Sequence, residues 1–213
     1  MPNTIPAAGR RSIPTNNIKG SVLTLHIQAI TFQQLWDNYV TGNPYDDPAG
    51  THKNQCAIRM SATLHRAGID MKSFSQKVVK PAKGKATIGR ILLNGKATST
   101  RANEMAQWLS LRPFEGLPAK PEDITGADWE GKVAGRTGII FFDGYWQQDG
   151  DSSDNLSGGH IDLWNGERLT ISGFWGSFST MGRYVGMQAM LPGTNFGWSD
   201  LGKSKKILFW EIP

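Results

Sequence analysis

The chain contains one cysteine, Cys56, and its thiol is the first candidate for nucleophilic chemistry. A single cysteine excludes an intrachain disulfide and a zinc site built from several cysteines. The residue is therefore either a small buried apolar side chain or a reactive thiol, and the surrounding sequence has to decide between the two.

The sequence that follows Cys56 predicts a helix over residues 57–67. Apolar side chains recur along it at steps of three and four residues: Ala57, Met60, Leu64 and Ala67. Cys56 would then lie at the first turn, where the positive end of the helix dipole lowers the pKa of a thiol. The free N–H groups of that turn could also stabilise the oxyanion of a tetrahedral intermediate.

A thiolate nucleophile needs a base, which must come from a distant part of the chain because no neighbour on the helix suits the role. The chain has four histidines. His65 is on the same helix but more than two turns from Cys56, and His26 is on the polar face of a predicted strand. His52 is in the loop before the cysteine. His160 opens a strand after a polar loop, where a sheet edge can present it to a helix start, and it is favoured over His52.

The remaining pattern predicts the elements that must position these two residues. A strand is predicted over 21–30, and Thr31 with Gln34 predicts a capping box at the start of the next helix. Further elements follow from their apolar patterns: a helix over 102–109, strands over 138–142, 160–164 and 169–171 with a turn at Asn165-Gly166, and a closing strand over 207–212. Helices first and antiparallel strands second predict an α+β fold, with the N-terminal helices packed on one sheet.

Length and composition indicate one globular domain. The chain has 213 residues, of which 38% are hydrophobic and 19% charged. Residues 1–20 hold several prolines and predict a flexible N-terminal arm, so the domain would span residues 21–213. No signal-peptide pattern and no long apolar run is found, which predicts synthesis in the cytoplasm without a membrane span.

The formal charge of +5 favours anionic partners. The basic residues are scattered rather than interleaved with aromatics in a stripe, so nucleic acid is not an expected partner. Asp149, Asp151 and Asp154 lack the glycine and distal glutamate of a calcium loop, and no metal is predicted.

Three segments occur in a specific order: residues 54–61 (Asn-Gln-Cys-Ala-Ile-Arg-Met-Ser), residues 138–142 (Gly-Ile-Ile-Phe-Phe) and residues 159–164 (Gly-His-Ile-Asp-Leu-Trp). Together with Trp36 and Tyr39 ahead of the cysteine, the set resembles the fourth group of type VI secretion amidase effectors, which are papain-like enzymes related to the NlpC peptidases. The resemblance implies a single papain-like amidase domain that needs no cofactor.

The resemblance also implies a function. Members are injected by the type VI secretion machinery into a competitor's periplasm, where they hydrolyse the amide between γ-D-glutamate and meso-diaminopimelate in peptidoglycan stem peptides. Carried over by motif, Cys56 is the nucleophile and His160 the general base. A toxin of this kind endangers its producer, so a cognate periplasmic immunity protein with an acidic patch is expected to cover the cleft.

This sequence departs from the family at the third member of the triad. The family has an acidic residue just after the Asn165-Gly166 turn, whereas Thr170, Ile171 and Ser172 stand there. Asp162 is two residues after His160 on the same strand face, and it either orients the imidazole or serves the structure. Thr170 is a weaker candidate for the same orienting role.

Some assignments near the cysteine remain open. Asn54 or Gln55 could donate a side-chain amide to the oxyanion. Arg59 could meet a substrate carboxylate, although a solvated helix face is the favoured interpretation. The tryptophans of the second half, Trp146, Trp164, Trp175 and Trp198, are predicted mainly to pack in the core.

Two other functions are compatible with the same residues. A papain-like domain could act as an acyltransferase or as a peptidase on another substrate, which the reaction product would reveal. A basic, aromatic-rich domain could also bind cell wall without catalysis, and Cys56 would then be an inert thiol.

Overall fold

The structure is a computed structural model that describes residues 9–14, 22–27, 29–52, 54–146, 158–170 and 201–213. At its centre is a four-stranded antiparallel sheet with the order β5–β8–β6–β7. The strands are β5 (Glu122–Asp123), β6 (Gly138–Trp146), β7 (Gly158–Trp164) and β8 (Lys206–Glu211). β7 pairs with β6 and forms one edge of this sheet, so one side of its backbone is free to meet another element.

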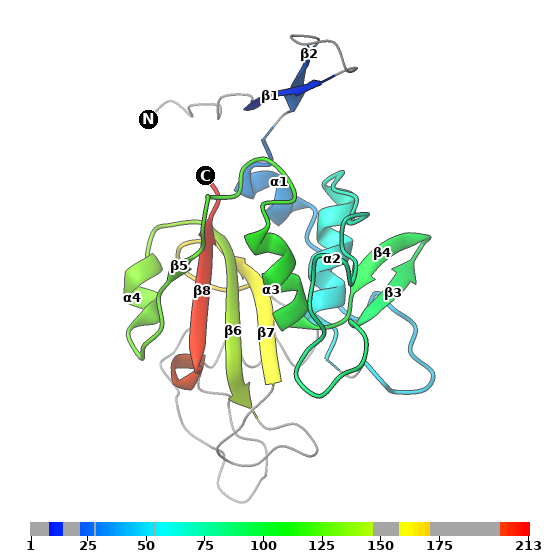
Figure 1. The fold of residues 1–213 in the computed structure, drawn as a ribbon. Helices are drawn as coiled ribbons and strands as arrows, with labels where there is room; N and C mark the ends of the chain where they lie inside the picture. The colour runs from blue at the N-terminus through cyan, green and yellow to red at the C-terminus, as the bar shows by residue number, and fades with distance from the viewer. Residues whose placement is uncertain (1–8, 15–21, 28, 53, 147–157, 171–200) are drawn as a thin grey trace, which may run out of the picture.

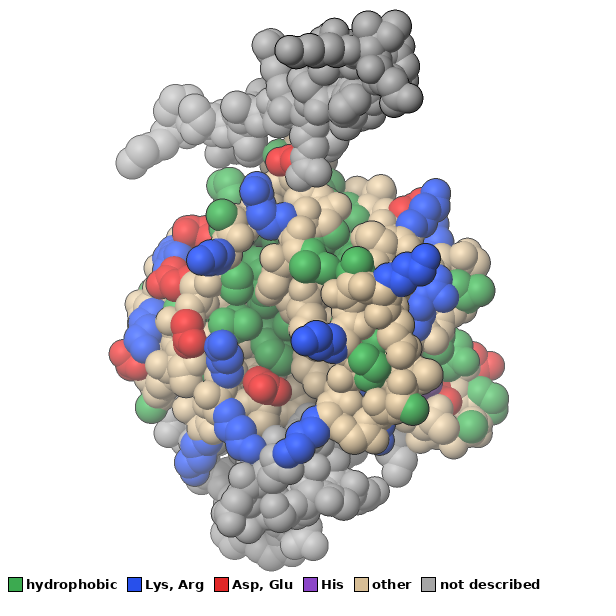
Figure 2. Space-filling model, viewed as in Figure 1, with side chains coloured by type: hydrophobic (Ala, Val, Ile, Leu, Met, Phe, Trp, Pro, Cys, Tyr) green, Lys and Arg blue, Asp and Glu red, His purple; other side chains and the backbone are tan. Residues whose placement is uncertain are grey.

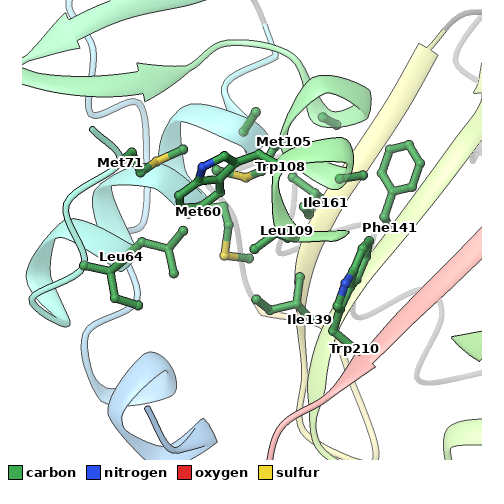
Figure 3. Close-up of a cluster of buried hydrophobic side chains, with 14 of the residues drawn as sticks. Met60, Leu64, Met71, Met105, Trp108, Leu109, Ile139, Phe141, Ile161 and Trp210 are labelled. Atoms are coloured by element: carbon green, nitrogen blue, oxygen red, sulfur yellow. The ribbon is translucent and has the colours of Figure 1, made fainter. Parts of the chain in front are cut away.

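The helices α1 (Phe32–Asp37), α2 (Cys56–Arg66) and α3 (Ala102–Ser110) lie together on one side (Figure 1). Apolar residues of α2 and α3 meet alternate residues of the sheet in the larger buried cluster (Figure 3). The strand residues in it include Ile139, Phe141, Ile161, Leu163 and Trp210. The predicted packing of N-terminal helices on an antiparallel sheet is therefore confirmed.

The opposite face of the sheet carries a second, smaller buried cluster. It contains the intervening strand residues Ile140, Phe142 and Phe209, which alternate with those of the first cluster as strand geometry requires. Trp164 joins them, as predicted for a core tryptophan, and its ring nitrogen donates to the Val133 carbonyl over 2.9 Å. The short helix α4 (Trp129–Val133) covers this face.

Hydroxyl groups tie α2 to its neighbours on two sides. The Thr63 hydroxyl accepts the backbone N–H of Val40 over 3.0 Å, which fixes the segment after α1. The Ser61 hydroxyl accepts the backbone N–H of Ser99 over 3.1 Å. Ser99 ends β4 (Lys96–Ser99), which forms a hairpin with β3 (Arg90–Leu93) beside α2 (Figure 1). The helix that begins with Cys56 is thus held by buried hydrogen bonds as well as by apolar packing.

The N-terminal region contains a pair of strands. The strand predicted over 21–30 is β2 (Val22–Ile27), but it pairs with β1 (Gly9–Pro14) rather than with the main sheet. The segment predicted as a flexible arm therefore contains a strand, and the two-stranded unit stands apart from the sheet and helices (Figure 1). The predicted capping box is confirmed, because Thr31 and Gln34 exchange both hydrogen bonds at the start of α1.

The C-terminal strand is reached through a short 3-10 helix, Leu201–Lys203. The predictions that concern residues 149–154, Ile171, Ser172, Trp175 and Trp198 lie outside the described residues. Lys and Arg side chains are spread over the face seen in Figure 2, with acidic residues between them. Among the described helices, none is long and apolar enough to cross a membrane.

Candidate active site

Cys56 is the first residue of α2, and Gln55 is its N-cap. The side chain is buried, with 5% of the residue exposed. It faces the free edge of β7, where the thiol lies 4.0 Å from the Gly159 carbonyl oxygen and beside the backbone N–H of Ile161. Alternate residues of a strand direct their peptide groups to the same side, so this edge can present both groups to one sulfur atom. The predicted position of Cys56 at a helix start is confirmed.

His160 lies on the same edge strand, close enough to Cys56 that each side chain shifts the pKa of the other. Its Nε2 atom is 3.3 Å from Oδ2 of Asp162, which leaves Nδ1 as the nitrogen available to the thiol. The imidazole stacks on the Phe142 ring with 6.4 Å between the ring centroids, and 14% of its side chain is exposed. The structure thus brings Cys56, His160 and Asp162 together in one chain of contacts.

Asp162 is itself held in a fixed orientation. Only 1% of it is exposed, and its Oδ1 atom accepts the Thr170 hydroxyl and, over 2.9 Å, the backbone N–H of Leu163. Thr170 is brought back to β7 by a turn and by a hydrogen bond from its N–H to the Leu163 carbonyl. Asp162 and Thr170 were alternative orienting residues in the sequence, and the structure joins them: Asp162 contacts the imidazole, and Thr170 contacts Asp162.

The electrostatics of the pair favour the thiolate. Burial raises the pKa of the Cys56 thiol, but the hydrogen bond and the charge of His160 outweigh this effect, so the pKa is lowered overall. Burial lowers the pKa of His160, whereas Asp162 and Cys56 raise it, with a net result of about 9. Both shifts favour the thiolate–imidazolium form of the pair over the neutral form.

The two amides beside the cysteine have other uses. Both ends of the Gln55 side chain bind the Tyr45 backbone, at 3.0 Å from its N–H and 2.9 Å from its carbonyl. Oδ1 of Asn54 accepts the Cys56 backbone N–H over 3.2 Å. Gln55 is therefore a structural residue that holds the preceding loop rather than a free oxyanion donor. The first N–H of the helix therefore already donates to Asn54, although it was expected to stabilise the oxyanion.

Arg59 is buried, with 6% of it exposed, so the interpretation of a solvated helix face is wrong. Its Nη1 atom donates to the Gly42 carbonyl over 3.0 Å, while its Nε atom has no hydrogen-bond partner among the described residues. The guanidinium is close enough to Cys56 and Tyr39 to favour their ionised forms. The sequence interpretation missed the burial of Arg59, since helical spacing alone did not show that this face of α2 is covered.

Two other histidine rings have contacts of their own. Nε2 of His65 is 3.0 Å from the Ala97 carbonyl oxygen, and the His52 ring meets the Tyr45 ring edge-on with 5.6 Å between the centroids. Within the described part of the chain, no cluster of three or more histidine, cysteine or acidic side chains could hold a metal ion.

An antiparallel sheet with α1, α2 and α3 on one face, a cysteine at a helix start and a histidine on the facing strand edge define a papain-like α+β domain of the NlpC type. Residues 52–210 match the family described as type VI secretion system (T6SS), amidase effector protein 4. The chain belongs to this family, and it is therefore a type VI secretion amidase effector and a hydrolase.

Two solved structures are similar to this chain, and the first of them supports the fold. The type VI effector Tae4 from Enterobacter cloacae has 20% sequence identity and a TM-score of 0.51, covering 86% of this chain and 96% of that chain. The effector Tae4 from Salmonella typhimurium, in complex with the immunity protein Tai4 from Enterobacter cloacae, has 18% identity and a TM-score of 0.46, covering 86% and 99%. At these identities the likeness concerns the fold alone. No curated protein matches the chain significantly.

The thiolate–imidazolium pair predicts a distinctive alkylation profile. Cys56 should react with iodoacetamide well below the pH at which an ordinary thiol reacts, because His160 lowers its pKa. In a His160→Ala variant only the Ile161 N–H and the charge of Arg59 still oppose the effect of burial, so the pKa of Cys56 should rise and the rate at pH 7 should fall about tenfold or more. The measurement is the alkylation rate between pH 5 and 10. Equal profiles for both proteins would contradict the pairing and favour an inert cysteine.

Proposed function

We propose that this effector is a cysteine amidase that hydrolyses the γ-D-glutamyl–meso-diaminopimelate amide of peptidoglycan stem peptides. The chain of contacts from Cys56 through His160 to Asp162 carries the proposal, because it supplies a nucleophile, a base and an orienting carboxylate. The substrate comes from the family resemblance together with the amidase description of the matching family.

The proposed reaction is acyl transfer to Cys56. The thiolate attacks the amide carbonyl, and the oxyanion that forms is stabilised by N–H groups near the start of α2. His160 gives the proton it holds to the leaving amine of diaminopimelate, and a thioester between Cys56 and the glutamyl γ-carbonyl remains. Neutral His160 then takes a proton from water, which attacks the thioester and releases the glutamate carboxylate and the Cys56 thiolate.

The geometry supports each role of the pair. The sulfur lies at a helix N-terminus beside a donor from the strand edge, so negative charge is favoured there in the resting enzyme. His160 is partly exposed, so a leaving amine can reach the ring from the solvent side. Asp162 is nearly inaccessible, which suits a group that orients the imidazole and does not touch substrate.

The reaction product tests this function directly. Digestion of purified peptidoglycan should release fragments that end at D-glutamate, together with one new free amine on diaminopimelate for each bond cut. Mass spectrometry and amine labelling measure both. A transferred acyl group without net hydrolysis would favour the acyltransferase alternative. Retention of the protein on the wall without any new amine would favour a binding module.

The proposal extends to the site of action and to the partner. Delivery by the type VI secretion machinery would place the enzyme in the target-cell periplasm, where the substrate is. A producer with the same cell wall then needs a periplasmic immunity protein. We propose that this protein covers the opening above Cys56 and His160, and that acidic side chains help it to bind a chain of formal charge +5.

A further inference from the structure

Arg59 is a buried cation on the same helix face as the nucleophile. It stands three residues after Cys56 on α2, and this spacing makes two helical side chains neighbours. Helix side chains lean toward the N-terminal end, so the arginine extends back over the turn that begins with Cys56. The exposed fraction is 6% for Arg59 and 5% for Cys56. Arg59 is therefore about as accessible as the residue whose thiol has to reach the substrate.

One side of the guanidinium has a structural task. Three polar side chains spaced four residues apart, starting at the N-cap of α2, bind the backbone of residues 40–45: Gln55, Arg59 and Thr63. Nη1 of Arg59 takes part by donating to the Gly42 carbonyl over 3.0 Å. A neutral amide can fill such a place, as Gln55 does one turn earlier. The contact with Gly42 therefore does not account for a positive charge.

The charge of Arg59 has no acidic counter-ion within the described part of the chain. The first turn of α2 contains no acidic residue, and the buried Nε–H of Arg59 has no hydrogen-bond partner among the described residues. A buried cation is unfavourable unless it is paired, and the positive end of the helix dipole makes this position less favourable still. The Cys56 thiolate is a nearby negative charge, but it is lost when the thioester forms. An anionic group of the substrate would remain.

We propose that Arg59 is a specificity-determining residue that binds the α-carboxylate of the D-glutamate whose γ-carbonyl is attacked by Cys56. This inference rests on the proposed function, because it names the part of the proposed substrate that the enzyme recognises. Gly42 occupies Nη1, which leaves the edge formed by Nε and Nη2. Two neighbouring nitrogens of a guanidinium bind a carboxylate through two parallel hydrogen bonds.

The spacing in the substrate matches the spacing on the helix. In a γ-glutamyl group, three carbon atoms separate the reacting carbonyl carbon from the carbon of the α-carboxylate, which is about 5 Å in an extended chain. Side chains three residues apart on a helix have Cβ atoms about 5–6 Å apart. The leaving amine has to lie beside His160 on β7, so the glutamyl group is the part of the substrate that can lie along α2.

The test compares two peptides on two proteins. One peptide is L-alanyl-γ-D-glutamyl-meso-diaminopimelate, and the other has the α-carboxylate of its glutamate converted to an amide. Calorimetry measures both dissociation constants with Cys56→Ala protein, which cannot cut the peptides. We expect the amide to bind about ten- to hundredfold more weakly, the range for loss of a charge-assisted hydrogen bond. After Arg59→Gln is added, the two peptides should bind equally.

Matched controls make the ratio of the two dissociation constants specific. Arg66→Gln removes the same charge from the exposed last turn of α2 and should leave this ratio unchanged. A third peptide is amidated on diaminopimelate instead of glutamate, and its binding relative to the parent peptide should not depend on Arg59. Equal binding of the carboxylate and the amide by protein that retains Arg59 would overturn the proposal. A ratio that survives Arg59→Gln, or a dependence on Arg59 for the diaminopimelate carboxylate only, would overturn it too.

A second variant replaces Arg59→Gln if that protein does not fold. Arg59→Lys retains the charge but not the edge of two nitrogens, so the ratio should fall below the arginine value. An unchanged ratio would contradict the assignment.

The binding experiment needs no hydrolysis, so it separates this inference from the proposed function. If the protein discriminates between the peptides but wild type releases no amine, the proposed function falls and the carboxylate site stands. If wild type cuts the carboxylate and amide peptides with equal kcat/KM, the amidase stands and the role of Arg59 falls.

Discussion

Replacing Cys56 with alanine should abolish peptidoglycan hydrolysis, with a loss of about 10⁴-fold or more. The variant lacks the only thiol in the chain, and no other described side chain near His160 can take its place as a nucleophile. The fold should survive, because alanine fits a buried helix position and removes a single atom. The change in unfolding free energy should be about 1 kcal/mol or less. Release of new amines measures the activity, and thermal unfolding measures the stability.

A matched pair of histidine variants controls this result. His160→Ala should be nearly as inactive as Cys56→Ala, because the two residues act as a unit. His65→Ala changes a histidine on the nucleophile's own helix whose ring is hydrogen-bonded to the Ala97 carbonyl, and it should retain activity. Periplasmic expression in a Gram-negative host should lyse cells for wild type and His65→Ala only. Lysis by Cys56→Ala would show that the toxicity does not come from acyl transfer.

Much of this arrangement could be predicted because its determinants are local. The apolar stripe after Cys56 fixes a helix, and a helix start fixes the environment of its first side chain. The polar loop before His160 and the turn after Trp164 similarly mark the two ends of a strand. The contact between these two segments is long-range. It was predicted from the resemblance to a family and not from the spacing of the residues.

Other features could not be predicted because they depend on what covers a surface. Arg59 is at a helix position that the sequence pattern predicts to be solvated, but the segment around Gly42 covers it in the folded protein. Tyr39 has helical spacing that places its ring near the core, but this spacing does not show that the negative charge of Asp162 raises the pKa of its hydroxyl. The β3–β4 hairpin is different. Asn94 and Gly95, both with positive φ angles, form a turn that the sequence does signal, although weak apolar periodicity around it hid the two strands.

Replacing Asp162 with asparagine should reduce kcat by about 10²- to 10⁴-fold, more than an isosteric change at a structural residue would. The reason lies in its two oxygens. Oδ1 accepts the Thr170 hydroxyl and the Leu163 N–H, so an asparagine would keep its carbonyl oxygen there. Its NH₂ group would then face Nε2 of His160, where Oδ2 now lies.

An amide donor at that place selects the wrong tautomer of the imidazole. Nε2 must accept the hydrogen bond, so Nδ1 carries the proton and faces the thiol as a donor instead of a base. The pKa of His160 should also fall from about 9, because the carboxylate charge is gone. The thiolate fraction at pH 7 should drop with it, and the alkylation rate of Cys56 reports this without any substrate.

The comparison with Asp162→Ala makes the argument specific. Alanine removes the carboxylate but imposes no tautomer, so it should retain more activity than asparagine although it changes the shape more. Adding Thr170→Val to Asp162→Asn should restore part of the activity, since the amide loses one of the two donors that fix its orientation. If alanine is the more damaging change, and Thr170→Val restores nothing, Asp162 acts by filling space. The orienting role would then have to belong to another residue.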